Sequence, residues 1–162
     1  MPILFNLRHL ERTALTLQGE LPIAELDIDG FDELIHARNT LQYDLHVEQL
    51  GDGVLVQGSL EVALDCECVR CLKAFPLPLT LGDWTCHLPL TGAEPVVPVN
   101  DCVDLTPWVR EDILLAFPQH PLCHPECRGL PAALGANRQP ASGARAGDEG
   151  SSAWAELNKL KL

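Results

Sequence analysis

Residues 41–48 read LQYDLHVE, with an apolar side chain at every second position. This period of two places one face of an extended strand in a core and the other face in water. The sequence GDG at 51–53 is typical of a hairpin connection. The alternation then resumes over residues 54–65, so the two runs predict a pair of long antiparallel strands that decides the fold class.

Shorter extended patterns flank this pair on both sides. Residues 3–10 and 14–28 read as β-like pieces, with a turn expected at Gly19, whereas residues 32–38 fit either a short helix or a loop. Residues 75–88 continue the alternation, although two prolines in this run cannot donate ladder hydrogen bonds. The run therefore predicts an edge strand.

Residues 104–117 carry the clearest helical pattern of the chain. Thr106 is a suitable N-cap, Pro107 suits the first helical position, and Pro118 ends the pattern. Asp112 is expected to face solvent, because it lies off the apolar stripe. The chain is therefore expected to have an α+β fold, with a curved antiparallel sheet or small barrel and one main helix packed on it.

The domain organisation follows from a change in composition near residue 130. Residues 1–130 are expected to form a single β-rich domain. Residues 131–152 are rich in Ala, Gly, Arg and Ser, which predicts a flexible segment. Residues 153–162 are expected to form a short C-terminal helix that includes Trp154.

Composition narrows the function classes. The formal net charge of −12 argues against an extended nucleic-acid-binding face, which needs clustered Lys and Arg. No segment has the long apolar run of a membrane-spanning helix, and the N-terminus lacks the pattern of a signal peptide. We therefore expect a cytoplasmic protein without a membrane partner, and its seven cysteines, an odd number, fit reduced thiols better than a disulfide framework.

Residues 66–73, CECVRCLK, hold three of these cysteines. Cys68 and Cys71 have the spacing of a zinc knuckle, in which a tight turn points two thiolates at one ion. Cys123 and Cys127 could complete a four-cysteine zinc site if the two clusters meet, with His124 as a spare ligand. The alternatives are reduced cysteines packed as small hydrophobic side chains, or cysteines with a redox or disulfide role.

Basic side chains accompany both clusters. Arg70 and Lys73 flank the knuckle, and Arg128 follows the second pair. These three cations would gather on one edge if the clusters meet, where they could hold an RNA phosphate or an acidic peptide. Ordinary solubilising charges explain them equally well.

Three motifs in order resemble a known family. They are CVRCLKAF at 68–75, DLTPWVREDILLAFP at 104–118 and PLCHPECRGL at 121–130. The sequence is similar to the YceD family, which is linked to accumulation of large-subunit (23S) ribosomal RNA. Many members carry two further cysteines where this chain has Pro131 and Leu134, so a metal site here depends on the long-range meeting of the two clusters.

The resemblance implies a ribosome-biogenesis factor without enzymatic activity. Its expected partner is a large-subunit ribosomal protein or precursor ribosomal RNA, with no small-molecule substrate. An acidic body is better suited to holding a basic ribosomal protein than to wrapping RNA. The alternatives are a zinc-stabilised RNA-binding module and a Cys-dependent enzyme. The enzyme is disfavoured because the sequence has no phosphate loop and no recognisable nucleophile motif.

Overall fold

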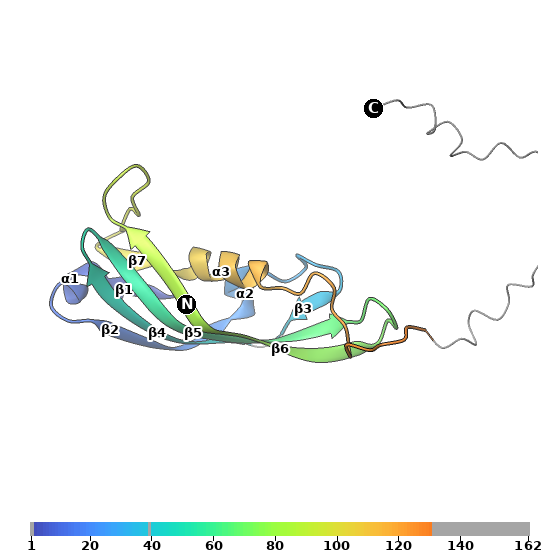
Figure 1. Ribbon diagram of the computed structural model, residues 1–162. Coiled ribbons are helices and arrows are strands. Elements are labelled where there is room, and N and C mark those ends of the chain that lie inside the picture. The colour runs from blue at the N-terminus through green and yellow to red at the C-terminus, as the bar shows by residue number, and fades with distance from the viewer. Residues whose placement is uncertain (1, 39, 131–162) are drawn as a thin grey trace, which may run out of the picture. The chain divides into compact units, whose positions relative to one another are not determined.

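The computed structural model describes residues 2–38 and 40–130 of the chain (Figure 1). In chain order the elements are β1 (Leu4–Asn6), α1 (Leu7–Leu10), β2 (Leu15–Pro22), α2 (Ile23–Leu26), β3 (Ile35–Ala37), β4 (Thr40–Leu50), β5 (Gly53–Glu67), β6 (Ala74–Pro89), β7 (Cys102–Asp104) and α3 (Thr106–Leu115). The expected α+β fold, with a curved antiparallel sheet and one main helix, is confirmed. The expected flexible segment and C-terminal helix lie outside the described residues.

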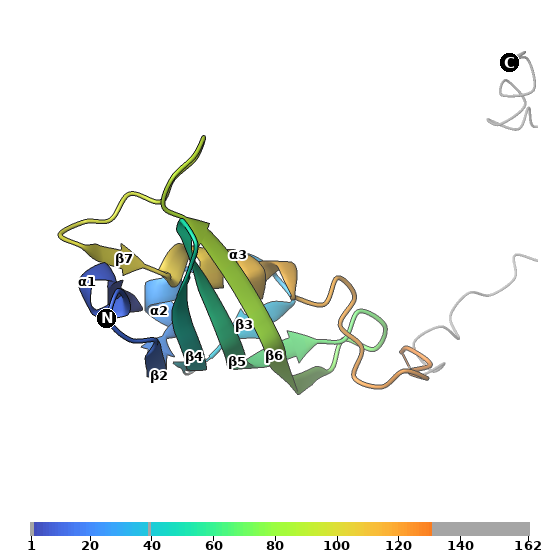
Figure 2. The ribbon, with the colours of Figure 1, turned by 60° about the vertical axis from the view of Figure 1, so that its left-hand side comes forward.

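The sheet is organised around β5. Of the 15 residues of β5, all except Ser59 pair with β6 along one edge. On the opposite edge the first part of β5 pairs with β4, and residues 64–66 pair with β3. Strand β2 pairs with the far edge of β4, and every pairing is antiparallel. Helices α2 and α3 lie on one face of this sheet, which leaves the other face open (Figures 1 and 2).

The N-terminal strand β1 pairs with β7, the strand that precedes α3, in a second, two-stranded sheet. The amide of Leu105 donates to the carbonyl of Ile3, and the amide of Ile3 donates to Oγ1 of Thr106. This pairing places α3 over the main sheet, where its apolar side chains complete a single core. Fully buried members of that core include Leu41, Leu45, Val47, Val54, Val56, Leu60, Val109 and Ile113.

A bulge in β6 keeps its apolar side chains on the core side. The β5–β6 register shifts between the Gly58–Trp84 and Leu60–Leu81 pairs, so two residues of β6 oppose one residue of β5. The buried Trp84 side chain reaches α3, where its Nε1 donates to Oδ2 of Asp112 at 2.6 Å. The expectation that Asp112 faces solvent was wrong, because its half-buried carboxylate anchors the helix to the sheet.

Several local predictions fail where a side chain contacts a distant element. The chain does not turn at Gly19, because β2 continues to Pro22. A Cβ at this position would lie 2.7 Å from the hydroxyl oxygen of Tyr43, so Gly19 makes room for that ring. Thr106 is not the N-cap of α3. The Oγ1 atom of Thr106 accepts a hydrogen bond from the amide of Ile3, which belongs to a distant segment. The amide of Thr106 itself donates to Oδ1 of Asp104.

Two short helices replace predicted β structure. Asn6 ends β1 and caps α1, because its side chain accepts from the amide of Arg8. Helix α2 follows Pro22 and ends at Asp27, which has a left-handed backbone (φ 49°). Residues 32–38 contain β3 rather than a helix or a plain loop. Within the described part of the chain, no helix has the length and apolar character needed to cross a bilayer.

Candidate metal centre and acidic sheet face

The knuckle forms at the end of the sheet where β5 turns into β6. The amide of Cys68 donates to the carbonyl of Lys73, and the amide of Leu72 donates to the carbonyl of Cys68, both at 2.9 Å. These bonds close the turn at Cys68–Lys73. Cys68 is buried inside it, whereas Cys71 is half-buried. The turn conformation thus points both thiols toward the segment that follows α3.

The second cysteine pair is held on this turn by backbone contacts. The amide of Val69 donates to the carbonyl of Pro121 at 3.0 Å, and Nη1 of Arg70 donates to the carbonyl of Cys127 at 2.9 Å. Within the second segment, the amide of Cys127 donates to the carbonyl of His124. Residues 121–130 therefore lie beside the β5–β6 turn (Figure 1).

The structure brings together the four cysteines that the sequence singles out. The Sγ atoms of Cys68, Cys71, Cys123 and Cys127 all lie within 4.8 Å of one another. The Cys68–Cys127 distance is 3.8 Å and the Cys71–Cys123 distance is 3.6 Å. Four sulfurs at about 2.3 Å from one tetrahedral ion would lie about 3.8 Å apart. The cluster thus has the dimensions of a four-thiolate metal site and could bind a metal ion.

The electrostatics of the cluster also fit a cation. Hydrogen bonds from the backbone N–H groups of Cys123, Cys71 and Arg70 lower the pKa of the Cys68 thiol to about 6. Hydrogen bonding to the neighbouring Cys71 thiol, together with desolvation, raises the pKa of Cys123 to about 12. The Cys68 thiolate therefore forms readily, whereas Cys123 resists ionisation. A bound divalent ion would remove that resistance, because it favours deprotonation of every ligand.

The third cysteine of the knuckle sequence, Cys66, and the spare ligand His124 lie outside the cluster. Cys66 is buried in the main core, and burial raises the pKa of its thiol. The Nδ1 atom of His124 accepts from the amide of Glu126 at 3.1 Å, and His124 is not one of the clustered ligands. All three of the predicted partner-binding cations are exposed, namely Arg70, Lys73 and Arg128. That these three residues bind a partner stays a prediction.

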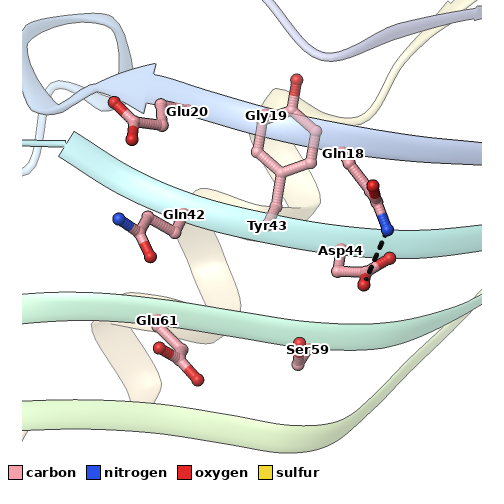
Figure 3. Close-up of a pocket in the computed structure, with 8 residues that line it drawn as sticks. All are labelled: Gln18, Gly19, Glu20, Gln42, Tyr43, Asp44, Ser59 and Glu61. Carbon is pink, nitrogen blue, oxygen red and sulfur yellow. Dashed lines mark hydrogen bonds between the residues drawn. The ribbon is translucent and has the colours of Figure 1, made fainter.

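The open face of the sheet carries a feature that sequence reasoning missed. A hollow of about 500 Å³ crosses β2, β4 and β5 (Figure 3). Its lining consists of Gln18, Gly19, Glu20, Gln42, Tyr43, Asp44, Ser59 and Glu61. Three of these residues carry carboxylates, and none is Lys or Arg. One hydrogen bond in the lining joins Nε2 of Gln18 to Oδ2 of Asp44.

The sequence already contains the unbalanced negative charge of this sheet, but it becomes apparent only when the strand boundaries are known. Strands β2, β4, β5 and β6 together contain seven Asp or Glu residues and no Lys or Arg. Arg38 lies outside these strands and pairs with one of these carboxylates, because its Nε is 2.8 Å from Oδ2 of Asp65. The sheet therefore presents negative charge that its own residues do not compensate.

Comparison with known proteins identifies the family. The family model described as "Large ribosomal RNA subunit accumulation protein YceD" matches residues 56–161. The chain belongs to the YceD family. The YceD match begins inside β5 and includes all four clustered cysteines. The family description names accumulation of ribosomal RNA and no reaction, so the absence of an enzymatic activity stays a prediction.

Similar curated proteins come from mycobacteria and are named as uncharacterised. One from Mycobacterium tuberculosis (strain H37Rv) is 30% identical over 102 residues, which cover 56% of this chain and 47% of the relative. One from Mycobacterium leprae is 27% identical over 146 residues, covering 83% of this chain and 66% of the relative. The chain thus spans about half the length of the Mycobacterium tuberculosis relative. No solved structure is significantly similar to this chain.

Proposed function

We propose that this protein is a cytoplasmic ribosome-biogenesis factor that supports accumulation of 23S ribosomal RNA by holding a basic large-subunit ribosomal protein on the open face of its sheet. Membership of the YceD family supports the link to the large-subunit RNA. The observation that carries the finer proposal is the complete lack of Lys and Arg in the four long strands.

Charge selects the partner class for this face. Exposed carboxylates without compensating cations attract a basic surface and repel phosphates. At physiological ionic strength the interaction extends over about 8 Å, so the carboxylates that line the hollow dominate it. Glu20, Asp44 and Glu61 lie around one depression, where a basic side chain can approach more than one of them (Figure 3).

A retention experiment tests this proposal. The immobilised protein is incubated at 150 mM salt with the proteins extracted from large ribosomal subunits, and the bound fraction is identified by mass spectrometry. A sheet-face variant carries Glu20→Gln, Asp44→Asn and Glu61→Gln. A control variant loses the same charge at exposed positions elsewhere, through Glu11→Gln, Glu94→Gln and Glu111→Gln.

We expect the wild type and the control variant to retain at least one basic ribosomal protein, and the sheet-face variant to retain at least tenfold less of it. Equal loss in both variants would show that only net charge matters. Purification with RNA but with no ribosomal protein would also overturn the proposal.

A second candidate function is a zinc-stabilised RNA-binding module, and the geometry of the four sulfurs favours it. In this proposal zinc is held by Cys68, Cys71, Cys123 and Cys127, and it fixes the β5–β6 turn to the segment after α3. The neighbouring cations Arg70, Lys73 and Arg128 would then contact RNA phosphates.

Metal analysis tests the zinc site directly. The protein purified without chelator is expected to contain one zinc per chain, and Cys123→Ser should lower zinc content and melting temperature. The matched control is Cys102→Ser, since Cys102 lies outside the cluster and its thiol accepts only a long hydrogen bond from Asn6. Equal zinc content in the two variants, or no zinc in the wild type, would contradict a four-cysteine site.

A further inference from the structure

The β5–β6 turn ends in a group of side chains that the core does not use, which we call the knuckle tip. It consists of Val69, Arg70, Leu72, Lys73, Arg128 and Leu130. Leu130 lies close to the turn because Gly129 sits against it, with a Cβ at Gly129 placed 3.4 Å from the carbonyl oxygen of Arg70. Three of the six side chains are aliphatic and three are cationic.

Leu72 is the unusual member of this group. Its φ is +59°, a left-handed conformation that costs a branched aliphatic residue more than it costs Gly or Asn. The bonds that close the turn at Cys68 hold it there. Its side chain is nevertheless 56% exposed and so gains little from packing. A strained backbone that presents an exposed apolar side chain suggests a contact made outside the chain.

The other aliphatic side chains extend the same surface. Val69 is 37% exposed and Leu130 is 50% exposed, and both flank the turn. Lys73 and Arg128 form no ion pair with any described residue, whereas Arg8 and Arg38 are each paired with an aspartate. The tip is therefore a place where an acidic protein offers cations and apolar surface together.

Charge also decides how an RNA could approach this protein. The long strands repel phosphates, because they carry only negative charge. The tip has three cations. A filled four-thiolate zinc centre has two formal negative charges beneath them, so the tip as a whole is close to neutral. Electrostatic attraction alone would then give weak binding, and the aliphatic side chains would have to supply the remaining binding free energy.

We propose that the knuckle tip is a docking surface for single-stranded ribosomal RNA, in which Leu72 packs against an unstacked base while the three cations contact the flanking phosphates. Sequence-specific recognition of RNA uses such splayed bases in loops and bulges. This inference rests on the second candidate function, because a metal bound by the four cysteines would reinforce the backbone hydrogen bonds that fix the tip. It does not depend on the protein-holding role of the sheet face.

Two substitutions separate a contact role for Leu72 from a structural role. Leu72→Gly and Leu72→Asn both suit a left-handed backbone and both remove the aliphatic side chain. We expect each variant to keep the zinc content of the wild type and to melt at the same or a higher temperature. Each should nevertheless bind a 23S ribosomal RNA transcript at least fivefold more weakly. Leu72→Met should retain most of the binding.

Salt dependence distinguishes Leu72 from the cations. Filter binding of the transcript is measured between 50 and 300 mM KCl, with a duplex RNA of equal mass as competitor. The Leu72 variants should leave the slope of log K against log salt unchanged. The variants Lys73→Gln and Arg128→Gln should each reduce it by roughly 0.7, as expected for one phosphate contact on a single strand.

Each other outcome has a defined meaning. Wild-type affinity in Leu72→Gly and Leu72→Asn overturns the role of Leu72. Equal competition by duplex RNA overturns the choice of single-stranded RNA. Failure of the wild type to bind the transcript overturns both this inference and the RNA-binding candidate, but it leaves ribosomal-protein retention by the sheet face intact. If the Leu72 variants instead lose a ribosomal protein, the tip contacts protein and this inference is wrong.

Discussion

Gly58 determines how closely the two central strands of the sheet approach each other. It pairs with Leu45 on β4 and has a φ of +156°. A Cβ at this position would lie 2.0 Å from the carbonyl oxygen of Asp44 and 2.9 Å from Cα of Leu45. Real Cβ atoms almost never approach other heavy atoms within 3.0 Å. The substitution Gly58→Ala therefore requires β4 and β5 to separate locally by about 1 Å.

The size of the effect follows from this separation. The ladder hydrogen bonds beside Gly58 would stretch, and two of them at about 1 kcal/mol each amount to about 2 kcal/mol. The backbone conformation adds about 1 kcal/mol for a residue with a Cβ. We expect Gly58→Ala to lower the free energy of unfolding by about 3 kcal/mol. For a domain of this size that corresponds to a fall in melting temperature of about 10 °C.

Gly82 offers a matched control on the neighbouring strand. A Cβ there meets no atom within 4 Å, so Gly82→Ala should change the free energy of unfolding by less than about 0.5 kcal/mol. Both variants are compared with the wild type by urea denaturation and thermal unfolding at equal metal content. A Gly58→Ala variant as stable as Gly82→Ala would refute the close approach of the strands.

Two further predictions concern the contact between α3 and the sheet. Asp112→Ala should lower the free energy of unfolding, measured by urea denaturation, by about 2 kcal/mol, because the buried Trp84 Nε1 loses a charged acceptor. The control is Glu111→Ala at the exposed neighbouring position, which should lower it by less than about 0.5 kcal/mol. Burial and the charge of Asp112 raise the pKa of Cys86 to about 11, so the folded state holds this proton more tightly than the unfolded state. The resulting stability is present below the ordinary thiol pKa and is lost as pH rises toward 11. The wild type should therefore lose more stability between pH 8 and pH 11 than Cys86→Ala does. Equal losses in the two proteins would contradict this origin of the pH dependence.

The sequence predicts those parts of the fold that depend on local periodicity. Alternation over residues 41–65 defines β4, the hairpin and β5, because one face of each strand is buried in the same core. The main helix is recognisable for the same reason, and the structure places it at Thr106–Leu115. These elements carry most of the core, so the fold class follows from them.

Features that depend on distant contacts were not predictable in this way. Gly19 is typical of a turn in the sequence, but in the structure it lies within a strand and leaves space for the Tyr43 side chain. The cysteine pairs were recognisable by spacing, but their meeting depends on the bonds from Val69 to Pro121 and from Arg70 to Cys127. Neither bond has a sequence signature, because each uses a backbone carbonyl that any residue could supply.

The two proposed binding regions are linked by a single strand. Glu61 of β5 lines the acidic hollow, and Cys68 follows seven residues later in the metal cluster. At about 3.3 Å per residue, roughly 23 Å of extended chain separates them. Substitutions this far apart, without shared partners, have nearly additive effects on free energy. If the sheet face holds a ribosomal protein and the tip holds RNA, variants of the two regions should weaken separate binding steps. Both regions would then have to be occupied at once to bring the protein and the RNA together during assembly of the large subunit.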